Sequence, residues 1–137
     1  MSLRRLGMAS GAAVGITVAL GIKTSTAHAA PNYDCDRGEV CLFENNNYNE
    51  NNTNHVYQWT GSDGDYTNNV WYNSTDGLDN EASSVKNNGG GSYNVTLYQH
   101  TSGGGANTTY APGTSDPSLS NNNIGDNRAS SHYWTHV

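Results

Sequence analysis

The chain has 137 residues and a formal net charge of −6 at pH 7, and 34% of its residues are hydrophobic. Its 12 acidic residues outnumber the 6 Lys and Arg residues. Charge repulsion therefore excludes nucleic acid and anionic membrane surfaces as partners, whereas cations or a basic protein surface would be attracted. This length provides for one small domain with a modest core.

Residues 1–29 have the features of a secretory signal peptide. Arg4 and Arg5 form a positively charged start, residues 12–22 are apolar and small, and Ala-His-Ala at 27–29 matches a cleavage site. A retained membrane anchor is the alternative, but the apolar run is too short and too rich in glycine to span a bilayer. We therefore expect cleavage before Ala30, a secreted extracellular protein, and no membrane contact after cleavage.

The predicted secreted domain, residues 30–137, contains 3 basic and all 12 acidic residues, and 3 minus 12 gives a net charge of −9. It also contains both cysteines, Cys35 and Cys41. Because export places them in an oxidising compartment, a disulfide is the expected state. A metal half-site is the alternative, but the sequence has no second cysteine pair to complete it.

After residue 30, short aromatic or β-branched runs alternate with Asn, Gly, Asp and Ser. Such runs favour strands, and the polar residues between them favour turns. An Asn-rich stretch at 45–47 is expected to be a hairpin turn, and the glycines at 89–91 a hinge between halves at about 33–88 and 92–137. The pattern predicts an all-β sandwich or barrel, with strands at 40–44, 55–59, 69–72, 83–87, 93–99, 108–110 and 131–134.

A six-residue sequence occurs once in each half. Residues 79–84 are Asp-Asn-Glu-Ala-Ser-Ser, and residues 126–131 are Asp-Asn-Arg-Ala-Ser-Ser. Such an internal repeat indicates a fold built twice from one unit. Each copy combines a carboxylate, an amide and two hydroxyls, which are the hard oxygen ligands that Ca²⁺ prefers. The alternative is that these side chains only hold tight turns by bonding to backbone N–H groups.

The repeat resembles the Asn/Asp-Asn/Asp-x-x-Ser/Thr-Ser signature of microbial βγ-crystallins. The resemblance implies an all-β, βγ-crystallin-like sandwich of two Greek-key motifs with two Ca²⁺ sites, each shared between the copies. Backbone carbonyls near Glu44 and Gln99 and water molecules would complete the coordination. The implied ligands are the hydroxyls of Ser83 and Ser130, the carbonyls of Glu81 and Arg128, and the side chains of Asp79 and Asp126, supported by Asn80 and Asn127.

The opening sequence Cys35-Asp36-Arg37-Gly38-Glu39-Val40-Cys41-Leu42-Phe43 resembles that of the secreted streptomycete metalloproteinase inhibitors, peptidase inhibitor family 36. That family shares the crystallin-like fold. The resemblance implies a monomeric inhibitor of an extracellular protease, which would contact its target through residues 45–54 or 101–116. The chain has no cysteine after Cys41, whereas the best-known inhibitors of this type carry a second disulfide.

Catalysis is not indicated by the sequence. No Gly-x-Ser-x-Gly elbow or Walker loop is present. His132 and His136 have the spacing of a helical zinc pair, but they lie in a predicted strand, and we expect them to be surface histidines, as are His55 and His100. We therefore expect a binding protein that is not an enzyme. The alternatives to a peptidase inhibitor are a calcium-stabilised extracellular structural module and an antimicrobial or glycan-binding effector.

Overall fold

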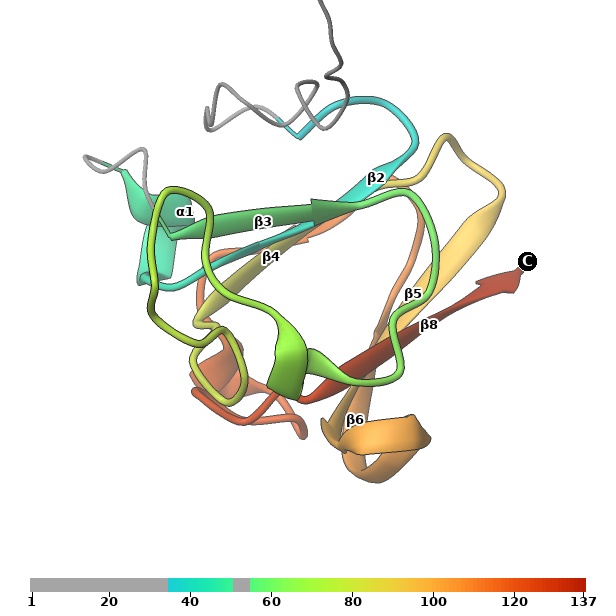
Figure 1. Cartoon of the computed structure of the whole chain (residues 1–137). Helices are drawn as coiled ribbons and strands as arrows, with labels where there is room; N and C mark the ends of the chain where they lie inside the picture. Colours follow the sequence, from blue (N-terminus) through green and yellow to red (C-terminus); the bar gives the residue numbers. More distant parts are fainter. Residues whose placement is uncertain (1–34, 51–54) are drawn as a thin grey trace, which may run out of the picture. The chain divides into compact units, whose positions relative to one another are not determined.

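The computed structural model describes residues 35–50 and 55–137 (Figure 1). The predicted signal peptide lies outside these residues. Short helical turns are α1 (Asn46–Asn49), η3 (Tyr66–Asn68), η4 (Thr101–Gly103) and η5 (Leu119–Asn121). Within the described part, no helix has the length and apolar character needed to cross a membrane. The strands are β2 (Glu39–Phe43), β3 (Val56–Trp59), β4 (Ser84–Asn88), β5 (Tyr93–His100), β6 (Gly104–Tyr110), β7 (Ser115–Asp116) and β8 (Ser131–His136).

The strands form two antiparallel sheets, with the orders β3-β2-β4-β7 and β6-β5-β8. Each sheet receives an edge from the other half of the chain. The second-half strand β7 pairs with β4, and Asp63 of the first half forms a bridge with His132 of β8. This reciprocal exchange joins the two halves. The two antiparallel sheets confirm the predicted all-β sandwich.

The core lies between the two sheets because alternate residues of their central strands face it. Val40 and Leu42 of β2 and Val95 and Leu97 of β5 belong to one cluster of fully buried side chains. The intervening residues of β2 point the other way, and Cys41 enters a smaller cluster with Phe43, Val56 and the aromatic residues around them. All five residues of β2 are therefore buried.

The strand predicted at 69–72 is absent from the described structure, and this prediction was wrong. Val70 forms only an isolated bridge with Gly77, and Asn73 has a left-handed backbone with φ 55°. Trp71 is nevertheless fully buried. The aromatic residues that suggested a strand here serve the core instead, because the Trp71 ring is buried without a ladder of backbone hydrogen bonds.

Gly89 follows β4, where the ring of Trp134 packs directly against its Cα. A Cβ at this position would overlap the Trp134 ring and lie 2.9 Å from Asn87 Oδ1. We therefore expect Gly89→Ala to destabilise the protein by about 1–3 kcal/mol, because a well-packed ring must shift. Urea denaturation followed by tryptophan fluorescence measures this loss. Gly61→Ala is the matched control, since a Cβ there meets no atom within 4 Å, and an equal loss in both variants would contradict the overlap.

Candidate metal-binding loops

The two copies of the repeated sequence occupy equivalent positions in the fold. Residues 79–84 lead into β4, and residues 126–131 lead into β8. In each copy the second residue has a left-handed backbone, with φ 62° at Asn80 and 58° at Asn127, a conformation that Asn adopts more readily than most residues. In each copy the alanine is buried in the core, which fixes the polar residues on either side of it.

The structure brings the two copies together. The backbone N–H groups of Asn80 and Asn127 each donate to the carbonyl of the alanine in the other copy, both at 3.0 Å. The Ser130 hydroxyl donates to Asn80 Oδ1 at 3.1 Å, and the Ser83 hydroxyl donates to Asn127 Oδ1 at 3.4 Å. Each fifth-position serine therefore meets the second residue of the other copy, rather than its opening aspartate.

The sixth residue of each copy shapes the neighbouring hairpin, a role that the sequence analysis did not identify. The Ser84 hydroxyl donates to the Asn45 carbonyl at 2.7 Å and accepts from the Tyr48 backbone N–H at 3.1 Å. Ser131 makes the equivalent pair of bonds in the second half, again at 2.7 and 3.1 Å. The occurrence of this serine in both copies could have indicated the role, because a buried hydroxyl needs hydrogen-bond partners.

One carboxylate oxygen in each copy has no partner. Oδ1 of Asp79 and Oδ1 of Asp126 are both buried and make no hydrogen bond within the described residues. A buried charged oxygen without a partner is costly, and here the same cost occurs at two equivalent positions. The side chains of the repeated residues offer carboxylate, amide and hydroxyl oxygens, which are ligands that Ca²⁺ prefers. The residues present therefore fit a hard divalent cation.

A cavity of about 560 Å³ opens beside the loops. It is lined by side chains from both copies, among them Asp79, Asn127 and Ser130, together with Gln99 of β5. Of the remaining predicted site residues, Arg128 also lines this cavity and is exposed, whereas Glu81 is half-buried. The opening has room for the water molecules that a Ca²⁺ ion would need to complete its shell.

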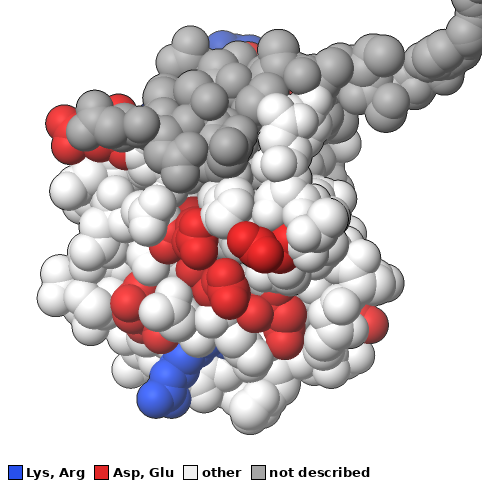
Figure 2. All heavy atoms as spheres, turned by 60° about the vertical axis from the view of Figure 1, so that its left-hand side comes forward, with Lys and Arg blue, Asp and Glu red and all other residues white. Residues whose placement is uncertain are grey.

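The surface charge favours cations. Figure 2 shows acidic side chains gathered on one face of the protein. Over residues 35–137 the chain carries only three basic side chains, those of Arg37, Lys86 and Arg128. The Lys86 ammonium lies over the Tyr48 ring, 4.7 Å from its centroid. A concentration of like charge raises the local concentration of counter-ions.

His132 is not a surface residue, and that prediction was wrong. The side chain is fully buried, and its two ring nitrogens lie 2.7 Å from the Tyr66 hydroxyl and 2.7 Å from the Gly61 carbonyl. Because a carbonyl only accepts, Nε2–H donates to Gly61, and Nδ1 accepts from Tyr66. Neither nitrogen is left for a zinc ion, and His136 is exposed at the far end of β8.

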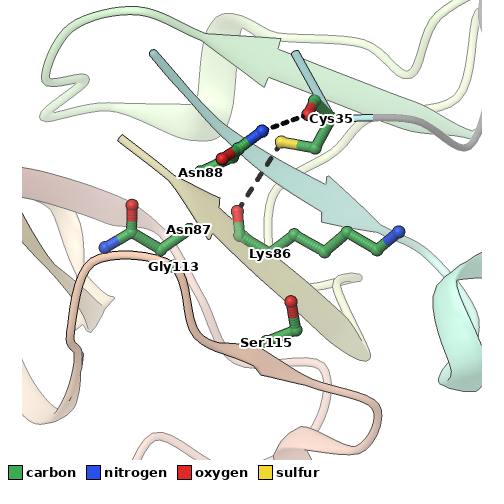
Figure 3. A pocket seen from close by; sticks show the side chains of 6 residues that line it. All are labelled: Cys35, Lys86, Asn87, Asn88, Gly113 and Ser115. Atoms are coloured by element: carbon green, nitrogen blue, oxygen red, sulfur yellow. Dashed lines mark hydrogen bonds between the residues drawn. The ribbon is translucent and has the colours of Figure 1, made fainter. Parts of the chain in front are cut away.

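Cys35 and Cys41 form the predicted disulfide. The bridge is held against β4, because the Asn88 amide donates to the Cys35 carbonyl at 2.6 Å and Cys35 Sγ lies 3.8 Å from the Lys86 carbonyl (Figure 3). Within the described ranges the one cluster of three His, Cys, Asp or Glu residues is Cys35, Glu39 and Cys41. Its cysteines are already bonded to each other, so they offer no thiolate to a metal.

Comparison with known proteins gives the family and the fold. Residues 28–110 match the model of peptidase inhibitor family I36. A βγ-crystallin from an archaeon is 22% identical, with 73% of this chain and 100% of that chain covered and a TM-score of 0.53. A βγ-crystallin from Ciona intestinalis is 18% identical, with 72% of this chain and 100% of that chain covered and a TM-score of 0.54. Spherulin 3a from Physarum polycephalum is 21% identical, with 76% of this chain and 88% of that chain covered and a TM-score of 0.52.

No curated protein sequence matches the chain significantly. The solved structures establish the fold, since their identity to this chain is too low to carry more. The family match spans more than half of the chain, from before the disulfide to the end of β6. The protein belongs to peptidase inhibitor family I36 and has the βγ-crystallin fold.

Proposed function

We propose that the protein is a secreted, non-catalytic inhibitor of an extracellular peptidase, and that two Ca²⁺ ions stabilise its domain. The family match supports the inhibitory function and a protease as the partner. The observation that supports calcium binding is the pair of buried, unpartnered oxygens on Asp79 and Asp126. Bound Ca²⁺ would neutralise these carboxylates and hold the two halves together. The contact with the peptidase would be made by residues of the protein, not by the ions.

Of the two segments expected to contact a protease, 101–116 is largely occupied by strands. It contains η4, β6 and β7, and exposed residues occur in η4 and β6 as well as in the turn at 111–114. The turn is closed by Thr114, whose N–H and hydroxyl both donate to the Ala111 carbonyl, at 3.1 and 2.7 Å. Pro112 fixes one backbone angle of the turn, and Gly113 N–H donates to the Asn87 carbonyl at 2.9 Å.

The other segment, 45–54, is described as far as residue 50. Asn47, Tyr48 and Asn49 are three successive residues with left-handed backbones. The Asn49 side chain accepts from the Asn45 N–H at 2.8 Å and donates to the His55 carbonyl at 2.9 Å. These bonds hold a conformation that is otherwise unfavourable, so residues 45–50 offer a twisted rather than an extended backbone.

The turn at 111–114 is therefore our preferred contact with the protease. It borders a cavity of about 430 Å³ that also involves the disulfide, with Gly113 and Ser115 on one side and Cys35 and Asn88 on the other (Figure 3). An exposed turn that is already ordered can enter a protease cleft without a further loss of conformational entropy. Inhibition would then be reversible and steric.

The test is a titration of a thermolysin-type metalloprotease and a subtilisin-type serine protease with the purified protein. We expect tight, reversible inhibition of at least one, and a 2- to 5-fold (roughly) weaker inhibition by Pro112→Gly, because glycine restores the freedom that Pro112 removes. Ser120→Gly, in the separate turn η5, is the control. Cleavage of the protein without any inhibition would contradict the proposal and leave a calcium-stabilised structural module as the function.

A further inference from the structure

A third cavity, of about 450 Å³, lies at the end of the β5–β8 pair, away from the repeated loops. Its lining consists of Tyr93, Trp134, Thr60, Ser62 and three glycines. No charged side chain lines it. Neither the proposed contact with a peptidase nor the candidate metal-binding loops involve this cavity.

Two aromatic rings form the walls of this cavity because of the strand register. Tyr93 pairs with His136, and Val95 pairs with Trp134, so Tyr93, Trp134 and His136 lie on one face of the sheet. Trp134 packs against the margin of the core, and Tyr93 and His136 lie beyond it. The Tyr93 and Trp134 rings are 6.0 Å apart at an interplanar angle of 82°, and His136 meets Tyr93 at 5.1 Å and 84°. The perpendicular rings form an apolar corner.

The corner is accessible and is combined with polar groups. Tyr93 is 42% exposed, one of three large exposed hydrophobic residues in the described part of the chain. The Ser62 hydroxyl accepts from the Trp134 backbone N–H at 3.0 Å, which leaves its own hydrogen to donate elsewhere. Thr60 adds a second hydroxyl. The Gly61 position leaves the rim open, since no atom lies within 4 Å of where its Cβ would be.

A suitable ligand must be apolar on one face, rich in hydroxyl groups at its edge and uncharged. The net charge of −9 over residues 30–137 opposes anionic glycans. A pyranose ring with equatorial hydroxyls satisfies all three conditions, because its C–H groups form a flat apolar face and its hydroxyls lie around the edge. Sites for small ligands commonly combine aromatic walls with a few such polar groups.

We propose that this cavity binds a neutral, β-linked polysaccharide strand, with one sugar ring stacked on Tyr93 or Trp134 and its hydroxyls bonded to Ser62 and Thr60. This activity is separate from peptidase inhibition and does not depend on it. It would attach the secreted protein to a cell wall or matrix, where it would act.

The test is isothermal titration of the purified protein with cellohexaose and with chitohexaose, and with hexagalacturonate as the anionic counterpart. We expect at least one neutral hexasaccharide to bind with a dissociation constant below about 1 mM, and hexagalacturonate to bind at least tenfold more weakly. Which neutral sugar binds distinguishes a glucan from an N-acetylated polymer. Absence of binding by both neutral sugars up to about 10 mM, or equal binding of the anionic one, would overturn the proposal.

Two variants locate the site. Tyr93→Ala removes one wall, and Gly61→Leu fills the opening while retaining both rings; each is expected to weaken binding at least tenfold. Tyr133→Ala is the matched control, because Tyr133 is next to Trp134 on the same strand but its ring packs against Tyr98 instead. Thermal melts show whether each variant is folded. Wild-type affinity in both folded test variants, or an equal loss in the control, would place binding elsewhere.

Discussion

Millimolar Ca²⁺ is expected to raise the melting temperature of the protein by roughly 10 °C or more, and Mg²⁺ at the same concentration to have little effect. An ion that binds only the folded state at 100 times its dissociation constant contributes about 2.7 kcal/mol per site, and 1 kcal/mol corresponds to about 4 °C in a domain of this size. Calorimetry in EGTA, Ca²⁺ and Mg²⁺ measures the shift. An unchanged melting temperature would leave the repeated residues as turn-forming groups only.

The double variant Asp79→Asn with Asp126→Asn distinguishes a metal site from a structural turn. It removes the charge of both carboxylates, each of which has a buried oxygen without a partner, but keeps the size of the side chains. We therefore expect the calcium response to disappear and the stability in EGTA to stay equal or rise. Ser83→Arg with Ser130→Arg should also abolish the response. Ser120→Arg, at an exposed serine outside the repeat, should retain it. A calcium shift that persists in the Asn variant would show that the ligands lie elsewhere.

His132→Leu is expected to lower the free energy of unfolding by about 3–5 kcal/mol. The substitution removes two buried hydrogen bonds and leaves the Tyr66 hydroxyl and the Gly61 carbonyl without partners. His136→Leu is the matched control on the same strand and should change stability by less than about 0.5 kcal/mol, because that side chain is exposed. Urea denaturation at pH 7 compares the two, and similar losses would show that the buried bonds contribute little.

The same histidine makes stability depend on pH. Burial lowers the pKa of His132 from its ordinary value of 6.5 to about 4, although the Gly61 carbonyl and Asp63 oppose the shift. Between about pH 6.5 and pH 4, His132 is therefore protonated in the unfolded chain but neutral in the folded protein. Stability is full above pH 6.5 and falls by about 3 kcal/mol on acidification to pH 4. Denaturation at several pH values should show this loss in the wild-type protein, and a correspondingly smaller one in His132→Leu.

Local patterns predicted the central strands well because those segments contain β-branched or aromatic residues and are bounded by turn-forming Asn, Gly, Asp and Ser. β2, β4, β5 and β8 begin within one residue of the predicted positions. β6 was predicted from residue 108 but starts at Gly104, since glycine carries no strand signal. The two-residue strand β7 was not predicted at all, because its pairing with β4 depends on tertiary contacts.

The repeated sequence indicated where the two loops are, but not how they face each other. The contact between Asn80 and Ser130 spans 50 residues, and only the exchange of edges between the sheets brings the copies together. His132 shows the same limit. In the sequence, a histidine that follows two serines resembles a surface residue, whereas its partner Tyr66 lies 66 residues away, beyond the reach of any local pattern.

The exchanged edges also determine what a single cut in the chain would do. Cleavage between the halves, in the exposed glycines at 90–91, would leave an N-terminal fragment whose sheet lacks β7 and a C-terminal fragment whose sheet lacks the Asp63 bridge. Each fragment retains the missing edge of the other, so the two remain interlocked and neither is complete alone. A peptidase that nicks the protein at this linker would therefore not separate the two fragments.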